Sequence, residues 1–421
     1  MSRQLTSRGG ARKLLSLDST YSLATIRERK LEHEITCRDL EGFFEHVWSV
    51  HPMVGASPEH VPGSGVGRPS IEQIAPRHTM IEGKVARFEW LEAVAPVNFL
   101  VAQSVLAGML MRLIRRERIS IVRAGDPYYL GLLGLFLARA NKLPLVVRIN
   151  ANQDSIYEAT RELAYPRLLR SRLTEKRVAR FVLSRADLVA PGSENNLRFA
   201  VANGAWRERS TIFRYGTWID PVHFRTDPRE RTSVRSELDL NDAPFLIIVG
   251  RLERVKHPED VLYVLAEARK HAPSLAAVFV GDGSMRPELE SMAAELGVAG
   301  QVRFAGNRDQ NWIARALASA TVVLSPLTGR ALVEACLSAT PVIAYDVEWH
   351  SELVTNGESG ILVPYRDTRA MAEAVNRLLS DAVAAQTMGE RARAVAAEMM
   401  DPARLMEHER SEYIRLLDRW R

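Results

Sequence analysis

Cysteine is almost absent from this chain. Only Cys37 and Cys336 occur in 421 residues, far apart and outside any CxxC pair, which argues against a disulfide framework and against a structural zinc site. Uninterrupted apolar runs long enough to span a membrane are also missing, and the apolar run in the basic N-terminal segment is too short for a signal sequence. We therefore expect a cytoplasmic protein, either soluble or in contact with the inner face of a membrane only at its surface.

The sequence also lacks short internal repeats, low-complexity tracts and a strong net charge. Its 56 basic and 51 acidic residues leave a net charge of +5. This balance suits a phosphate-bearing ligand or an anionic membrane surface and requires no nucleic acid. The length suggests roughly two to three domains, each able to bury its own core.

Short apolar strands alternate with amphipathic helices through most of the chain. This rhythm predicts right-handed crossovers and parallel sheets, that is, an α/β fold of two Rossmann-like doubly wound domains. Strands are expected at residues 13–17, 45–50, 119–123, 145–149, 188–190, 211–214, 245–249, 276–280, 302–305, 321–324 and 342–344. Helices are expected at residues 98–117, 128–141, 163–184, 194–203, 258–271, 286–296, 312–319, 368–380 and 382–399, with a further one starting at Ala331.

The turn-rich, charged stretch at residues 221–242 is the expected linker. It predicts an N-terminal domain at residues 1–225, a second domain at 226–400, and a final helix at 401–421 that packs back across the linker. Residues 53–68 carry six Gly or Pro residues without periodicity, so we expect a flexible loop that could cover a site. Residues 80–90 fit either a strand or a helix.

The helix at residues 98–117 ends in four arginines, namely Arg112, Arg115, Arg116 and Arg118. Cations at this end complement the helix dipole. They could also meet an acidic surface, which leaves a peripheral membrane contact open beside the plainer interpretation of a solvated helix face.

Residues 320–344 combine a buried strand, a polar loop, a helix and a second strand. A loop at the carboxyl edge of a parallel sheet that leads into a helix N-terminus favours a bound anion such as a diphosphate. Glu334 lies near the start of that helix, where a carboxylate would accept hydrogen bonds from sugar hydroxyls. The alternative is a surface glutamate that merely complements the helix dipole.

Basic residues follow another expected strand end, in Gly250-Arg251-Leu252 and at Lys256. A glycine lets the backbone approach a ligand closely, and Arg and Lys both bind phosphate oxygens. Gly281-Asp282-Gly283 forms a second glycine turn, which by itself is as often structural as functional.

Several motifs follow one another in an informative order: GRLERVK, VGDGSMRPELE, VRFAG, GRALVEA, TPVIAYD and ESGILVP. Together they resemble the donor-binding half of retaining GT-B glycosyltransferases of the glycosyl transferases group 1 family, from about residue 245 to 379. ADLVAPGSENN and IFRYGTWIDPVHF extend the resemblance more weakly into the first half. The resemblance implies a GT-B architecture with the two domains facing across a cleft.

The resemblance implies roles for individual residues. Arg251 and Lys256 would bind the donor diphosphate and stabilise the leaving nucleotide, so that neither a metal nor another cofactor is needed. Glu334 would bind the ribose. The implied donor site comprises Gly250, Arg251, Lys256, Gly281, Asp282, Gly283, Thr328, Gly329, Arg330, Ala331 and Glu334.

The sequence departs from the family at Pro326. The family usually has a second glutamate eight positions before the ribose-binding one, where it meets the donor sugar, and here that position is Pro326. A proline side chain accepts no hydrogen bond, so Thr328, Arg330 or a carboxylate from elsewhere would have to take over, or the donor is held differently.

The first half also departs from the family, because its usual glycine-rich acceptor loop and mid-domain histidine are missing. The polar residues that stand at strand ends instead are each more often turn or cap residues than functional ones. Those predicted for the acceptor side are Asp18, Ser19, Tyr21, His51, Asn150 and Asn152, and Asp126 and Asp154 are predicted to be catalytic.

The sequence leaves two main functions open. One is a glycosyltransferase that moves a sugar, with retention, from a nucleotide-diphosphate sugar to a glycan or lipid-linked acceptor in polysaccharide or cell-envelope synthesis. The other is a nucleotide-sugar-binding or scaffold protein of the same fold without turnover. A nucleotide-sugar epimerase is a more remote third candidate.

Overall fold

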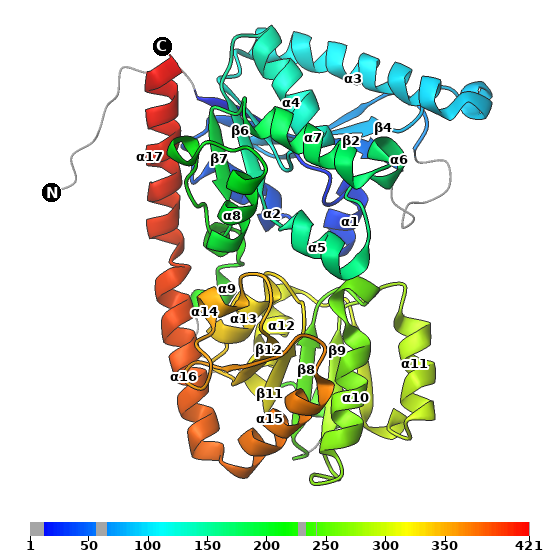
Figure 1. Ribbon diagram of the computed structural model, residues 1–421, viewed down its shortest axis with the longest axis vertical. Helices are drawn as coiled ribbons and strands as arrows, with labels where there is room; N and C mark the ends of the chain where they lie inside the picture. Colours follow the sequence, from blue (N-terminus) through cyan, green and yellow to red (C-terminus); the bar gives the residue numbers. More distant parts are fainter. Residues whose placement is uncertain (1–11, 56–64, 226–232, 241, 421) are drawn as a thin grey trace, which may run out of the picture. The chain divides into compact units, whose positions relative to one another are not determined.

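The computed structural model describes residues 12–55, 65–225, 233–240 and 242–420 (Figure 1). The chain forms two compact units, the first made of Met1–Arg214 with Met406–Arg421 and the second of Tyr215–Leu405. The sequence pattern predicts these divisions after residues 225 and 400. The expected loop at residues 53–68 lies largely outside the described residues, and the expected linker lies partly outside them.

The first unit is a seven-stranded sheet with helices around it. Its strands are β1 (Lys13–Leu17), β2 (His46–Val54), β3 (Ser70–Ala75), β4 (His78–Lys84), β5 (Ile121–Ala124), β6 (Leu145–Ile149) and β7 (Leu188–Pro191). Its helices are α1 (Leu23–Glu28), α2 (His33–Thr36), α3 (Ala95–Glu117), α4 (Tyr129–Ala140), α5 (Gln153–Thr160), α6 (Pro166–Leu169), α7 (Arg172–Leu183), α8 (Glu194–Ala202) and the greater part of α17 (Pro402–Trp420).

The second unit is a six-stranded sheet. Its strands are β8 (Phe245–Val249), β9 (Ala276–Val280), β10 (Val302–Gly306), β11 (Val322–Ser325), β12 (Val342–Tyr345) and β13 (Ile361–Val363). Its helices are α9 (Val222–Arg225), α10 (Pro258–Ala268), α11 (Arg286–Glu295), α12 (Gln310–Ser319), α13 (Ala331–Leu337), α14 (His350–Leu353), α15 (Thr368–Ser380) and α16 (Ala382–Met399). Short 3₁₀ helices include η2 (Glu89–Val94) and η7 (Arg254–Lys256).

Strand order defines one switch point in each sheet. The first sheet runs β3-β4-β2-β1-β5-β6-β7, with all neighbours parallel except the antiparallel pair β3 and β4. The second runs β10-β9-β8-β11-β12-β13 and is parallel throughout. The order therefore reverses between β1 and β5 in the first unit and between β8 and β11 in the second. Ligands of doubly wound sheets bind outside the carboxyl ends of such strand pairs.

Burial explains why the strands read as continuous apolar runs. Every residue of β8, β9, β11 and β12 is buried, because helices cover both faces of a parallel sheet. In the first unit α17 closes one face, where Tyr413 and Leu416 pack with Leu14 and Phe213 in one apolar cluster. The predicted α/β class with two Rossmann-like units is confirmed.

Three local predictions were wrong. β2 does not stop before Pro52 but continues to Val54, with a register shift after His51; a bulge tolerates a proline that lacks an N–H. The expected strand at residues 211–214 is not one: the N–H groups of Thr211 and Phe213 donate to β7, but the pairing amounts only to an isolated bridge between Val189 and Ser210. The expected helix at residues 163–184 is divided into α6 and α7.

Candidate active site

The candidate donor site lies at the switch point of the second sheet. β8 ends at Val249, and the segment from Gly250 to Lys256 follows it directly. β11 pairs with β8 and ends at Ser325, where the loop leading into α13 begins. The topology thus brings together the two predicted phosphate-binding segments, which are about 70 residues apart in sequence.

The Gly-Asp-Gly turn after β9 supports the loop after β8 through backbone contacts. A Cβ atom at Gly281 would lie 2.0 Å from the carbonyl oxygen of Gly250, and one at Gly283 would lie 2.4 Å from that of Leu252. The N–H of Leu252 donates to the carbonyl of Asp282 at 3.1 Å. Only glycine allows the two loops to approach this closely, so the turn positions the loop that carries the basic residues.

Asp282 has local partners of its own. Its Oδ1 accepts from the N–H of Gly283 at 2.8 Å, and its carboxylate lies 3.6 Å from Arg286. Glu253 accepts from the N–H of Ser284 at 2.9 Å and from its hydroxyl at 2.7 Å. These contacts are those of a turn that braces a neighbouring loop, and donor contact by Asp282 stays a prediction.

Lys256 meets the loop before α13. Its Nζ lies 3.7 Å from the position that a Cβ of Gly329 would occupy, and Gly329 has a φ of +67°, which favours glycine. Burial lowers the pKa of Lys256, a nearby carboxylate of Glu348 opposes this shift, and the positive charges of Arg251 and Arg330 add to it. Three cationic side chains therefore act on one another at this sheet edge, an arrangement that favours a bound polyanion.

Glu348 was not predicted from the sequence. It follows β12, which pairs with β11, and has a left-handed backbone with a φ of +51°. Burial raises its pKa, and the charge of Lys256 opposes that rise. No single motif marked it, although its place shortly after a buried strand was a usable signal.

Polar contacts of His257 and Glu259 hold the backbone that follows Lys256. His257 adopts a left-handed φ of +52°, and its Nε2 lies 2.7 Å from the hydroxyl of Tyr365. Arg366 forms an ion pair of 2.7 Å with Glu259. Burial would raise the pKa of Glu259, but hydrogen bonds from His257 and Arg366 lower it to about 2. These contacts fix the backbone at the start of α10, directly after Lys256.

Contacts of the loop before α13 bear on which residues could contact the donor sugar. Pro326 is buried, and the hydroxyl of Thr328, also buried, is hydrogen-bonded to that of Ser325. Arg330 donates to the carbonyl of Trp218 at 3.4 Å, and its guanidinium lies 5.6 Å from the centre of that indole ring. Both predicted substitutes for the missing glutamate therefore have protein partners, so a carboxylate from another loop becomes the better candidate.

Glu334 lies on the less buried side of α13. The helix buries Leu332, Val333 and three residues from Ala335 to Leu337, whereas Ala331 and Glu334 are both partly exposed. Residues three apart share a helix face. Ala331 and Glu334 are thus presented together, which is compatible with the predicted ribose contact.

The first unit places its polar candidates at its own switch point. Asp18 follows β1; its carboxylate accepts from Arg38 at 2.6 Å and from the N–H and the hydroxyl of Thr20 at 2.9 and 2.6 Å. Burial would raise the pKa of Asp18, but Arg38 and Thr20 outweigh burial and lower it to about 2. Asp18 therefore remains ionised and holds the loop after β1.

Asp126 and Ser19 meet through a residue that the sequence analysis missed. The hydroxyl of Tyr165 donates to Oδ2 of Asp126 at 2.5 Å and lies 3.5 Å from Oγ of Ser19, while the N–H of Tyr128 donates to Oδ1 of Asp126 at 2.7 Å. Burial raises the pKa of Asp126 to about 6 despite these hydrogen bonds. The strand ends of β1 and β5 thus hold a carboxyl group suited to proton exchange near neutral pH.

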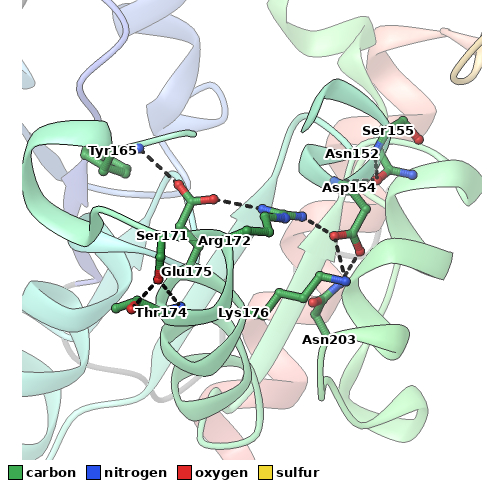
Figure 2. A network of polar contacts seen from close by, with 10 residues as sticks. All are labelled: Asn152, Asp154, Ser155, Tyr165, Ser171, Arg172, Thr174, Glu175, Lys176 and Asn203. Atoms are coloured by element: carbon green, nitrogen blue, oxygen red, sulfur yellow. Dashed lines mark hydrogen bonds and ion pairs between the residues drawn. The ribbon is translucent and has the colours of Figure 1, made fainter. Parts of the chain in front are cut away.

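Asp154 is engaged by several partners (Figure 2). It forms ion pairs with Arg172 and, at 3.3 Å, with Lys176, and it accepts from the side-chain amide of Asn203 at 2.9 Å. Asn152 caps α5 by accepting from the N–H groups of Asp154 and Ser155 at 3.1 and 3.2 Å. These contacts favour a role in joining α5, α7 and α8, and a catalytic role for Asp154 stays a prediction.

The same network extends to Tyr165. Arg172 donates to Glu175 at 2.9 Å, and Glu175 accepts from the backbone N–H of Tyr165 at 3.2 Å (Figure 2). Because the hydroxyl of Tyr165 contacts Asp126, a chain of ion pairs and hydrogen bonds connects Asp154 with the switch point between β1 and β5. Asp154 can therefore influence the acceptor side as a positioning residue.

The remaining acceptor-side predictions divide between core and surface. His51 is buried within β2, where its Nδ1 accepts from the N–H of Met53 at 3.3 Å. Tyr21 packs against the small apolar cluster that contains Leu23. Asn150 follows β6 and is exposed. Among the described residues, no group of three or more His, Cys, Asp or Glu side chains could hold a metal ion.

Comparison with known proteins agrees with the geometry of the second unit. The family model described as Glycosyl transferases group 1 matches residues 230–395. This unit belongs to the glycosyl transferases group 1 family. The match includes the segment that carries Arg251 and Lys256 and the helix α13 that carries Glu334, so the group 1 unit contains the whole candidate donor site.

Relatives of the group 1 unit extend over varying parts of the chain. D-inositol 3-phosphate glycosyltransferase of Nocardia farcinica is 32% identical over 51% of this chain and 50% of its own length. Alpha-D-kanosaminyltransferase of Streptomyces kanamyceticus is 30% identical over 38% of this chain and 43% of its own length. The chain thus spans about half the length of these relatives. A GDP-mannose-dependent mannosyltransferase of Mycolicibacterium smegmatis that acts on phosphatidylinositol monomannoside is 27% identical over 73% of this chain and 79% of its own length.

Solved structures confirm the GT-B fold class. HepE of Anabaena in complex with UDP and glucose has a TM-score of 0.70 at 18% identity over 94% of this chain and 98% of its own. Sucrose-phosphate synthase of Thermosynechococcus elongatus has a TM-score of 0.73 at 18% identity over 97% of this chain and 99% of its own. At this identity the similarity defines the fold.

Proposed function

We propose that the protein is a glycosyltransferase that moves a sugar from a nucleotide-diphosphate sugar to a hydroxyl group of a glycan or lipid-linked acceptor, with retention of configuration. One observation carries the proposal. The Nζ of Lys256 lies 3.7 Å from the position that a Cβ of Gly329 would occupy, at the switch point of a group 1 unit and within the electrostatic influence of Arg251 and Arg330. A diphosphate is the ligand that such a cluster of cations accommodates best.

The proposed reaction breaks the bond between the anomeric carbon of the donor and its phosphate oxygen. The electron pair goes to the leaving diphosphate, a new bond forms between the anomeric carbon and the acceptor oxygen, and the acceptor hydroxyl loses a proton. Lys256 and Arg251 would stabilise the charge that grows on the leaving group. Asp126, with its pKa raised to about 6, is the proposed proton acceptor of the first unit.

Glu348 is the proposed replacement for the sugar-contacting glutamate that Pro326 displaces. β11 and β12 are neighbours, with Ser325 paired to Ala344, so the loops after them lie side by side. Glu348 in the second loop already interacts with Lys256, which we propose as a diphosphate ligand. We propose that its carboxylate accepts hydrogen bonds from donor-sugar hydroxyls.

The cations are proposed to replace a divalent metal ion at the diphosphate. EDTA should therefore leave transfer unchanged, whereas a loss that is restored by added Mg²⁺ would contradict this part of the proposal. Retention is tested separately by the anomeric configuration of the product in proton NMR. An inverted product would show that the donor is attacked from the opposite face.

The test of the main proposal combines a donor screen with one variant. Purified protein is offered UDP- and GDP-linked sugars, and binding is followed by thermal shift because a ligand that binds only the folded state raises the melting temperature. Sugar transfer to glycan and lipid-linked acceptors and donor hydrolysis are then measured for the wild type and for Lys256→Met. Lys270→Met is the matched control, because Lys270 is exposed and pairs with Glu267 at 2.5 Å.

A donor-binding protein without turnover is the second candidate, favoured by the buried Pro326 in place of the family glutamate. It predicts a thermal shift with a nucleotide sugar but neither transfer nor hydrolysis with any acceptor. Absence of a shift with every donor would contradict both candidates.

A further inference from the structure

One face of the first unit carries an unusual number of exposed apolar side chains. α3, α4 and α7 form one helical layer, and their inner sides share a single apolar core cluster with the sheet. Figure 1 shows the three helices in the upper part of the first unit. We call their outer side, with the segment that precedes α3, the α3–α4–α7 surface. Its exposed large apolar residues are Phe88, Trp90, Val94, Val97, Leu100, Val105, Phe136, Leu173 and Phe181.

The exposed fractions are high for such side chains. They reach 76% for Trp90, 63% for Leu100, 60% for Leu173 and 52% for Phe136. Single exposed apolar residues are common on soluble proteins, whereas their concentration on one face indicates an interaction site.

The aromatic pair at the start of this surface is held in place. Asn98, in the first turns of α3, accepts from the N–H groups of Arg87 and Phe88 at 2.6 and 3.0 Å and donates to the carbonyl of Phe88 at 2.7 Å. The rings of Phe88 and Trp90 stack with centroids 5.4 Å apart. Trp90 is thus presented to solvent from a fixed segment.

Positive charge accompanies the apolar residues. The segment before α3 contains Glu89 and Glu92, but from Val94 to Arg116 the sequence has no acidic residue. Arg112, Arg115 and Arg116 are exposed at the end of α3. The acidic residue nearest to this end, Glu117, pairs with Lys13 and Arg116.

The outer side of α7 repeats the pattern. Glu175 and Ala179 face the interior, while Arg177 and Arg180 lie on the exposed side with Phe181. The carboxylate of Glu175 is turned inward to Arg172, so the exposed part of this helix is basic and apolar.

We propose that the α3–α4–α7 surface docks on the surface of an anionic lipid bilayer. Aromatic rings favour the level of the headgroups, apolar side chains gain by entering the interface, and arginines pair with anionic lipids. Among the described residues, only α3 is a helix long and apolar enough to cross a membrane. Leu106, Leu110 and Ile114 of α3 pack in the core of the unit, so the helix lies along the bilayer and does not span it.

A vesicle flotation assay with the full chain tests the proposal. The two vesicle types are pure phosphatidylcholine and phosphatidylcholine enriched in phosphatidylglycerol. The wild type should float with the anionic vesicles, and this binding should weaken steeply as salt is added. Leu100→Asp should weaken binding by at least about tenfold, because it places a carboxylate where an apolar side chain would enter the interface. The double variant Arg112→Glu/Arg177→Glu should weaken it by about 10³-fold, since each arginine contributes about 1 kcal/mol at an anionic surface and charge reversal doubles the effect.

Two matched controls separate this surface from general effects of charge. Val383→Asp changes an apolar residue of similar exposure on α16, and Lys270→Glu/Arg369→Glu reverses two exposed charges of the second unit. Both controls should bind vesicles like the wild type. Unchanged melting temperatures would show that all variants are folded.

Three outcomes would overturn the proposal. They are equal binding to both vesicle types, equal loss in the surface variants and the controls, and no vesicle binding by the wild type. A concentration-dependent dimer that Leu100→Asp dissociates, without vesicle binding, would instead identify the surface as a self-association face.

Discussion

Replacing Lys256 by methionine tests the centre of the proposed donor site, because this change removes the charge and keeps most of the side-chain length. A hydrogen bond to a charged group contributes about 1.5–3 kcal/mol, and loss of one donor that stabilises transition-state charge costs about 2.7–4 kcal/mol. Since Arg251 and Arg330 remain near the same point, we expect a loss at the lower end of the second range. This corresponds to about a 10²-fold decrease in kcat/KM.

The division of that loss between kcat and KM tells which role Lys256 has. If the ammonium stabilises charge that grows on the leaving diphosphate, kcat falls more than KM rises. If it binds the diphosphate equally before and during the reaction, KM rises alone. Initial rates over a range of donor concentrations, measured beside Lys270→Met, separate the two.

Stability supplies an independent check on the same variant. Burial lowers the pKa of Lys256, so the charged form is less favourable in the folded protein than in the unfolded chain. Folding at neutral pH therefore carries a cost that methionine removes, and Lys256→Met should melt at the same temperature as the wild type or higher. A variant that melts lower but turns over normally would refute the reasoning and make Lys256 a structural residue.

Three further changes test other parts of the structure. Glu348→Gln should lower transfer by about tenfold while the thermal shift with free nucleoside diphosphate persists, because a sugar contact is weakened and the proposed diphosphate ligands Arg251 and Lys256 are retained; loss of both would argue against a sugar-specific role. Asp126→Asn should remove a rise of kcat/KM with pH through about 6. It should also remove a fall in the free energy of unfolding between pH 3.8 and about 6. This fall is expected because a carboxyl group whose pKa is raised by folding loses its stabilising effect as pH rises through the folded value. Unchanged profiles in both measurements would contradict the buried carboxyl. Glu409→Leu should lower the free energy of unfolding by about 3–5 kcal/mol in urea titrations, because it leaves Arg148 buried without the carboxylate that lies 3.5 Å away. Adding Arg148→Met to the same chain should recover most of this loss.

The positions of the candidate donor residues could be predicted from the sequence because the patterns that mark them are local. The basic segment follows β8 directly, and the loop with Gly329 follows β11 directly. Buried parallel strands are recognisable as apolar runs, and their carboxyl ends meet at one sheet edge. Once the strands are assigned, the convergence of Lys256 and Gly329 follows from topology alone.

The acceptor side depends on contacts that no local pattern contains. Tyr165 lies between α5 and α6 in a segment whose pattern predicts one long helix, yet its hydroxyl contacts both Asp126 and Ser19. The ion pair of Asp18 with Arg38 connects two separate loops. Side chains with such partners can be placed only after the packing of several elements is known. The position at a strand end therefore identified Asp18 and Asp126 as polar groups at the carboxyl edge of the first sheet, but it could not describe their charge states.

For Asp154 the structure shows contacts that its position in the sequence did not indicate. It follows β6, as a catalytic residue of a parallel sheet would. Arg172 and Lys176, four residues apart on α7, lie on the same helix side and both reach its carboxylate. A carboxylate that is already bound by two cations and an amide has little capacity left for a substrate, and its pKa is lowered in spite of burial.

The consequence of Pro326 for catalysis depends on the neighbouring strand of the sheet. A glutamate at that position would project from the end of β11, but a buried proline closes the loop there and presents no polar atom of its side chain. β12 is the next strand, about 4.8 Å away, and the N–H of Val347 bonds back to the carbonyl of Tyr345 at 2.9 Å. This turn and the left-handed backbone of Glu348 keep the following carboxylate close to the same sheet edge, where it acts on Lys256. The missing carboxylate can thus be supplied one strand further along the sheet, so the proline alone is not sufficient reason to exclude catalysis.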